Sequence, residues 1–147
     1  VVDVDHPYRD EQPVALNQAD LVLLVFRLDF NSLRHAHRTM EHLARLGLAG
    51  GRVRLVVNRS GQPGEVPRAK AEEALGGAIA HAVPEDAKAV GRANNNGVPV
   101  VLESPGSKVA RSLVQLARSL GPAVAEERGR AAGTSRWRPW RRAGSLA

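Results

Sequence analysis

The chain has 147 residues, of which 43% are hydrophobic, and a formal net charge of +6. A chain of this length predicts one domain that buries about 68–70% of its unfolded surface. The absence of cysteine excludes disulfide bonds, thiolate metal sites and cysteine catalysis. Residues 123–147 hold six arginines and two glutamates, so we assign most of the positive charge to this tail and do not interpret it as a nucleic-acid footprint of the remaining chain.

Short apolar runs that end in polar residues alternate with helical patterns along the chain. In chain order they are Val1-Val2 before Asp3, Leu21–Leu28 before Asp29, Val53–Val57 before Asn58-Arg59, and Ala78–Val83 before Pro84-Glu85-Asp86. This alternation predicts parallel strands joined by crossover helices, whose carboxyl ends meet at one ligand-binding edge. The predicted fold class is α/β, with an open, mainly parallel sheet of about five short strands and helices on both faces.

Helical periodicity and capping residues fill the segments between these runs. Apolar residues at a spacing of three and four predict a helix that is capped by Asn31 or Ser32 and ends at Gly47. Asp29 to Ser32 is also well explained as helix capping, so Asp29 is assigned no catalytic role. Further helices are expected within 7–17, over 67–76, from Glu85 to Gly97, and from Ser107 to Gly121. Val98–Leu102 is expected to be a strand at the edge of the sheet, because Pro99 has no N–H group to donate to a neighbouring strand. Since buried parallel strands usually run five or six residues, Val1-Val2 indicates a chain that begins inside an element.

Four stretches of the sequence carry a resemblance to a known family. They are Val1–His6, Ala19–Arg38 with its Asp29–Arg34 segment, Leu55–Arg59, and Val83–Arg111 with its Pro84-Glu85-Asp86 and Asn95–Pro99 segments. In this order they resemble the C-terminal part of a MinD/ParA-like P-loop ATPase, closest to the CpaE/TadZ-like proteins of Flp (Tad) pilus assembly. The resemblance implies that 1–121 is a partial, Rossmann-like three-layer P-loop NTPase domain that lacks the Walker A strand. Residues 122–147 are predicted to be a disordered basic tail with Arg and Trp.

The resemblance implies ATP and Mg²⁺ as cofactors and assigns roles to six residues. Asp3 would be the Walker B aspartate, a catalytic residue that holds a water of the Mg²⁺ shell. Asn58 would hydrogen-bond the adenine edge with Arg59 alongside the base, and the loop of Pro84, Glu85 and Asp86 would pack on the other face of the base. The chain departs from the family at Asp5, where proline is common. It also contains no Gly-x-x-x-x-Gly-Lys-[Ser/Thr] phosphate loop, which would lie upstream of residue 1.

Each of these assignments also has a structural alternative, and both stay open at this point. Asp3 and the Asn58-Arg59 pair are typical of turns after strands, and Pro84–Asp86 is typical of a helix start. Gly106-Ser107-Lys108 is interpreted as a capped helix start. The spacing of His35, His37 and His42 argues against a metal site, although His37 and Glu41 are four residues apart. His6 and His81 have no visible partner in the sequence.

The function that the resemblance implies is that of an ATP-binding protein that positions or assembles Flp/Tad-type pilus or secretion machinery. The expected partners are a second copy in a homodimer and the proteins of that machinery, and the expected location is the cytoplasm or the periphery of the inner membrane or cell pole. The alternatives are a non-catalytic localisation scaffold and a partitioning or septum-site ATPase. Arg136–Arg142 suits an anionic membrane or nucleic acid, although Pro139 interrupts any helix there. Without the phosphate loop, the chain is expected to be unstable or inactive by itself.

Overall fold

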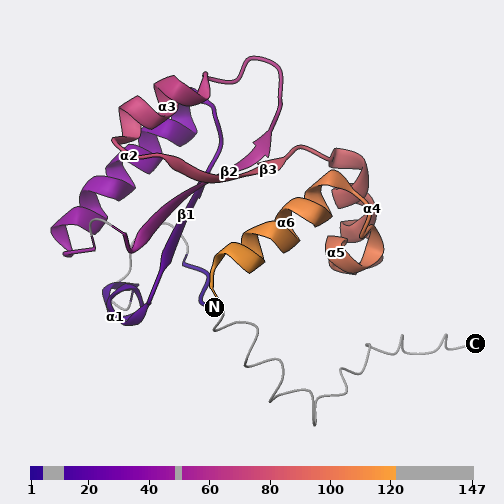
Figure 1. Cartoon of the computed structure of the whole chain (residues 1–147), viewed down its shortest axis with the longest axis horizontal. Helices are drawn as coiled ribbons and strands as arrows, with labels where there is room; N and C mark the ends of the chain where they lie inside the picture. The colour runs from indigo at the N-terminus through magenta and orange to yellow at the C-terminus, as the bar shows by residue number, and fades with distance from the viewer. Residues whose placement is uncertain (5–11, 49–50, 122–147) are drawn as a thin grey trace, which may run out of the picture. The chain divides into compact units, whose positions relative to one another are not determined.

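The computed structural model describes residues 1–4, 12–48 and 51–121 (Figure 1). Its contacts divide the chain into two units, Val1–Val114 and Gln115–Ala147, and the three strands lie in the first. The predictions made for Asp5, His6 and the tail of residues 122–147 lie outside the described residues. No helix within the described part of the chain is long and apolar enough to cross a membrane.

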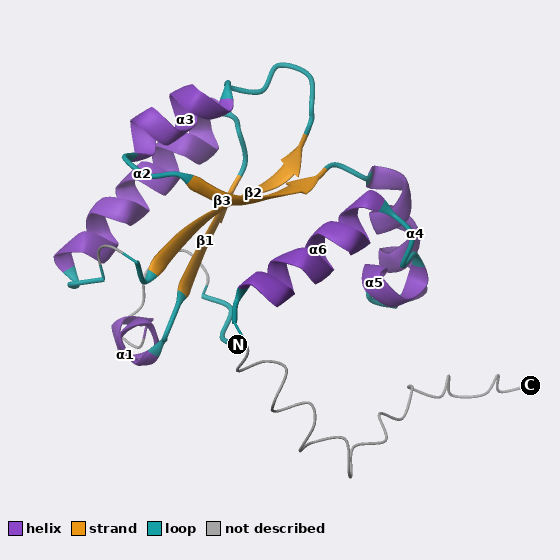
Figure 2. Cartoon of the chain, in the orientation of Figure 1, coloured by secondary structure: helices purple, strands orange, loops and turns teal. Residues whose placement is uncertain are grey.

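The described residues form an α/β fold around a parallel sheet (Figure 2). The strands are β1 (Val22–Phe26), β2 (Val53–Ser60) and β3 (Ile79–Pro84), in the order β1-β2-β3. The helices are α1 (Gln12–Gln18), α2 (Phe30–Arg45), α3 (Arg68–Leu75), α4 (Ala87–Asn96), α5 (Val100–Glu103) and α6 (Lys108–Ser119). The predicted fold class is confirmed, with three strands in the described residues instead of about five.

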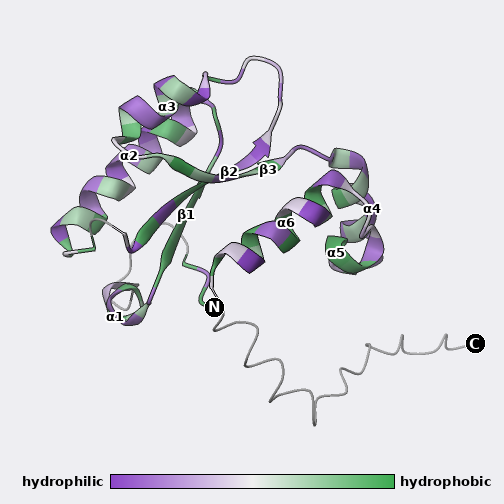
Figure 3. Ribbon diagram, in the orientation of Figure 1, coloured by the Kyte–Doolittle hydropathy of each residue, from purple (hydrophilic) through white to green (hydrophobic). Residues whose placement is uncertain are grey.

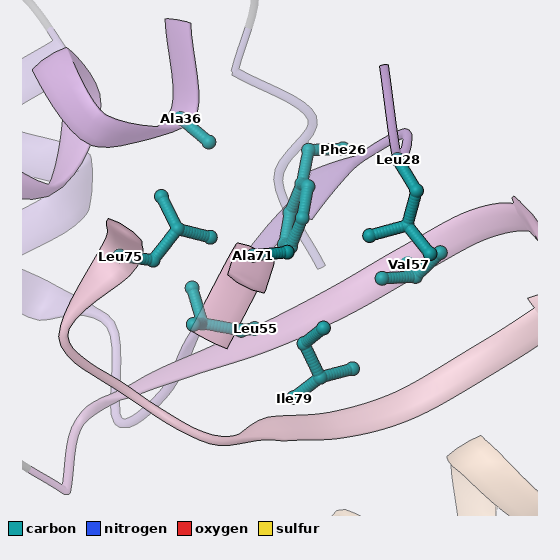
Figure 4. Packing of buried hydrophobic residues seen from close by; sticks show 8 residues of the cluster. All are labelled: Phe26, Leu28, Ala36, Leu55, Val57, Ala71, Leu75 and Ile79. Atoms are coloured by element: carbon teal, nitrogen blue, oxygen red, sulfur yellow. The ribbon is translucent and has the colours of Figure 1, made fainter. Parts of the chain in front are cut away.

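Helices α2 and α3 cover one face of the sheet with the main hydrophobic core. Because side chains alternate along a strand, Leu55 and Val57 of β2 point to this face. They pack with Phe26, Leu28, Ala36, Ala71, Leu75 and Ile79 (Figure 4). β1 is hydrophobic along its length, whereas α2 and α6 mix hydrophobic and hydrophilic residues as amphipathic helices do (Figure 3). This packing holds the three strands in register, so their carboxyl ends meet at one edge.

A register shift in β3 sends one histidine to the opposite face of the sheet. Leu55 pairs with Ile79 but Val56 pairs with His81, so β3 contains one extra residue between them. His81 Nε2 lies 2.8 Å from Ser112 Oγ of α6, and the same hydroxyl donates to the carbonyl oxygen of Ala82 at 3.2 Å. Helix α6 is therefore joined to β3 by a polar contact that the sequence did not reveal.

Two elements expected from the sequence are wrong. Val98–Leu102 is not an edge strand, because Leu102 and Glu103 donate their backbone N–H groups to the carbonyl oxygen of Pro99 and begin the short helix α5. These local hydrogen bonds outweigh the β-propensity of the valines. Val1-Val2 is not part of a strand either, and both side chains are exposed.

The cap of α2 also differs from the expected one. Asp29, rather than Asn31 or Ser32, is the N-cap: its Oδ1 accepts from Ser32 N and its Oδ2 from Ser32 Oγ, both at 2.9 Å. The hydrogen bond from the Ser32 backbone lowers the pKa of the Asp29 carboxyl group, although desolvation opposes this, while the Ser32 hydroxyl and Arg27 lower it further.

Replacing Asp29 with alanine is expected to lower the free energy of unfolding by about 1 kcal/mol. Because the folded pKa is lowered, this advantage of Asp29 is complete above the ordinary aspartate value of about 3.9 and is lost as the pH falls through the folded value. Urea unfolding at pH 7 and at pH 2.5 measures both effects. The control is Asn31→Ala, which should stay within about 0.5 kcal/mol of the parent. An equal loss in the two variants would contradict the assignment of the cap.

Candidate functional site

The polar residues that follow the three strands meet at the carboxyl edge of the sheet. Because β1, β2 and β3 are parallel, the segments after Phe26, after Val57 and after Val83 lie at the same edge. Ser60 pairs with Pro84, and the backbone N–H of Glu85 donates to the carbonyl oxygen of Ser60 at 2.9 Å. The structure therefore places the end of β2 directly against the loop that follows β3.

The end of β2 contains a bulge at two of the predicted site residues. Val57 pairs with Ala82 and Ser60 with Pro84, so Asn58 and Arg59 together oppose a single residue of β3. Arg59 has φ of +58°, in the left-handed region that costs a non-glycine residue roughly 1–2 kcal/mol. Strain and bulges of this kind concentrate at functional edges, where they redirect side chains.

A chain of side-chain hydrogen bonds, here called the edge network, joins the loops after all three strands. It consists of Arg27, Arg59, Gln62 and Glu85. Glu85 Oε2 accepts from Arg59 Nε at 2.5 Å and from Gln62 Nε2 at 3.1 Å, and Gln62 Oε1 accepts from Arg27 Nη2 at 3.1 Å. Arg27 is also ion-paired with Asp29 at 3.5 Å.

The carboxamide of Asn58 is exposed and makes no hydrogen bond or ion pair with any residue that the structure describes. This distinguishes it from its neighbour Arg59, whose guanidinium group is held by Glu85. Asp86 is also engaged, because its Oδ1 accepts from Ala89 N at 3.1 Å and caps α4. Among the five residues predicted to surround a base, Asn58 is the only one with a carboxamide, the group that can pair with a base edge, and the described residues leave it unpaired.

Asp3 does not join this group in the described structure. Residues 1–4 form no helix or strand, and no hydrogen bond or ion pair links Asp3 with another described residue. Among residues 1–4, 12–48 and 51–121 there is also no group of three or more His, Asp or Glu side chains that could hold a metal ion. The described residues alone therefore supply no cluster of protein ligands for a metal ion, and the role of Asp3 stays a prediction.

A pocket of about 440 Å³ opens beside this edge, at the start of α4. It is lined by Asp86, Lys88, Ala89, Arg92, Glu103, Ser104, Gly106 and Ser107. Ser107 caps α6, since its Oγ accepts from Ala110 N at 3.2 Å, which supports the interpretation of Gly106-Ser107-Lys108 as a helix start. Sequence reasoning missed the pocket because its walls come from segments up to 21 residues apart, from Asp86 to Ser107.

Comparison with known proteins supports the fold and part of the resemblance. No family model and no curated protein matches the chain. A ParA family ATPase from Chlorobium tepidum is similar with a TM-score of 0.67 and 22% identity over 72% of this chain and 43% of its own. The cell division ATPase MinD of Pyrococcus furiosus is similar with a TM-score of 0.60 and 28% identity, over 69% of this chain and 42% of its own. MinD of Pyrococcus horikoshii, solved as a complex with Mg-ADP, is similar with a TM-score of 0.62 and 22% identity, over 74% of this chain and 44% of its own.

The chain is thus structurally similar to ParA and MinD ATPases over part of their lengths, and it spans less than half of each of these solved structures. At these identities the likeness shows the fold. The finer resemblance to CpaE/TadZ-like proteins rests on the sequence stretches alone.

Proposed function

We propose that this chain is the base-binding portion of a ParA/MinD-like ATP-binding protein. The observation that carries the proposal is the carboxamide of Asn58, which has no partner among the described residues and is presented by a bulge at the carboxyl edge beside the Pro84–Asp86 loop. A carboxamide offers one donor and one acceptor, which match the polar edge of adenine. The similarity to a MinD structure solved with Mg-ADP supports a nucleotide as the ligand class.

The phosphates and Mg²⁺ require residues that the described part of the chain does not provide. Phosphate binding in this class needs a loop of backbone amides with a lysine, and no such motif occurs in the sequence. We infer that Asp3 contributes to Mg²⁺ binding only in an assembly that contains this loop, where the metal would neutralise phosphate charge. The chain alone is therefore expected not to hydrolyse ATP.

The free edge of β1 supports a further strand in the functional assembly. Among the described residues β1 pairs only with β2, which leaves its other edge open to a further strand. Val25 of β1 is also 54% exposed, although the faces of parallel strands are normally covered, so a further element would also cover this face.

The four sequence stretches further support a role in positioning Flp/Tad-type pilus or secretion machinery, as a homodimer that switches its partners with nucleotide state. The similarity to cell division ATPases favours a septum-site role as the second candidate. A localisation scaffold would bind nucleotide without turnover.

Adenosine tests the base site directly, because it carries no phosphate and the proposed contacts lie within this chain. We expect adenosine, but not guanosine, to shift the amide NMR signals of residues 58–60 and 84–86. Asn58→Ala should weaken adenosine binding about tenfold, since a two-point carboxamide–adenine contact contributes about 1–3 kcal/mol. The control is Asn94→Ala, an exposed asparagine in α4. Equal binding of both nucleosides, or unchanged affinity in Asn58→Ala, would refute the proposal.

A further inference from the structure

Gln62 occupies the centre of the edge network. Its Nε2 donates to Glu85 and its Oε1 accepts from Arg27, while its backbone N–H donates to Glu65 Oε1 at 2.9 Å. The orientation of the carboxamide follows from chemistry, because a guanidinium group only donates and a carboxylate only accepts. A glutamate at this position would repel Glu85, and a cation would repel Arg27. A carboxamide satisfies both neighbours at once.

The two residues beyond Gln62 determine the geometry next to Asn58. Glu85 is held at two points: its backbone donates to Ser60, and its side chain, 23% exposed, accepts from Arg59 and Gln62. Arg59 is held by Glu85 in a left-handed conformation, which fixes the backbone adjacent to Asn58. Each contact is partly exposed and therefore modest in energy, but together they tie the loops after β1, β2 and β3.

We propose that Gln62 is a positioning residue for base recognition. Through its contacts with Glu85, which in turn holds Arg59, it fixes the direction in which the Asn58 side chain leaves the sheet edge. This inference rests on the proposed function. Gln62 touches no base itself. By holding the Arg59–Glu85 ion pair in place, Gln62 keeps the Asn58 carboxamide free. It also lowers the entropy that is lost when these side chains become ordered around a bound base.

The experiment titrates the 147-residue chain with adenosine and with guanosine by NMR and compares the parent with Gln62→Ala, Gln62→Glu and the nearly isosteric Gln62→Met. We expect each variant to weaken adenosine binding about three- to tenfold, because Ala and Met lose two hydrogen bonds of modest net strength, whereas Glu keeps the contact with Arg27 but repels Glu85. The preference for adenosine over guanosine should fall as well, which a merely structural role would not change. The melting temperature should stay within a few degrees of the parent, because the contacts of the network are partly exposed and each is modest in energy.

Two controls separate the inference from the function on which it rests. Gln115→Ala, at an exposed glutamine of α6, should bind adenosine like the parent. Arg27→Ala combined with Gln62→Ala should be no weaker than Gln62→Ala alone, because the two residues act through one chain of contacts. If the parent binds adenosine and the Gln62 variants bind it equally well with unchanged selectivity, the inference is wrong and the proposed function stands. If the parent binds no adenosine, both are wrong.

Discussion

Replacing Phe26 with alanine is expected to lower the free energy of unfolding by about 3–5 kcal/mol, a large share of the roughly 5–15 kcal/mol that stabilises a typical domain. Phe26 is 6% exposed and is the aromatic side chain of the main core, where β1 meets β2 and α2 (Figure 4). Its loss would leave a cavity beside Leu28 and Val57 that neighbouring side chains cannot fill without strain. Urea or thermal unfolding followed by circular dichroism measures the change.

Val25→Ala is the matched control, one residue earlier in the same strand. Val25 points away from this core and is 54% exposed, so its truncation should cost no more than about 0.5 kcal/mol. A similar loss in both variants would show that β1 is not held to the sheet through Phe26. The comparison therefore tests the register on which the carboxyl edge depends.

Replacing Ser112 with alanine is expected to cost about 1–3 kcal/mol of unfolding free energy, because two hydrogen bonds of about 0.5–1.5 kcal/mol each are lost to half-buried partners, His81 and the Ala82 carbonyl. Ser112 is 7% exposed and donates to the carbonyl oxygen of Ala82. The Ser112 hydroxyl also lies 2.8 Å from His81 Nε2, so the two side chains share a hydrogen bond. Chemical unfolding of the 147-residue chain measures the loss.

The controls for Ser112 are a neighbour and a double-mutant cycle. Arg111→Ala, on the exposed side of α6, should stay within about 0.5 kcal/mol of the parent. His81→Ala combined with Ser112→Ala should cost at least about 0.5 kcal/mol less than the two single losses added together. Strict additivity would mean that the two side chains are not coupled and that α6 is not held to β3 by this contact.

Features that depend on neighbours in the sequence were predicted well. The helix that ends at Gly97 and the cap at Ser107 follow from backbone conformation and from hydrogen bonds three or four residues apart. The sequence also predicted that two segments, Asn58-Arg59 and Pro84–Asp86, lie at the same edge of the sheet, because parallel strands place their carboxyl ends together. The predictions failed where local signals competed: Asp29 caps α2 before Asn31 or Ser32 can, and Pro99 begins a helix where a strand was expected.

The sequence by itself determined the α/β class, the order of β1, β2 and β3 along the chain, and the candidate residues at their ends, since periodicity and turn chemistry act over a few residues. Only the tertiary structure decided which of these side chains are free. It paired Arg59 with Glu85 across 26 positions and Arg27 with Gln62 across 35, and it left Asn58 unpaired within the described residues. Such contacts depend on strand register and on single-residue bulges, and a bulge leaves no periodic signal in the sequence because it is itself a break in the period.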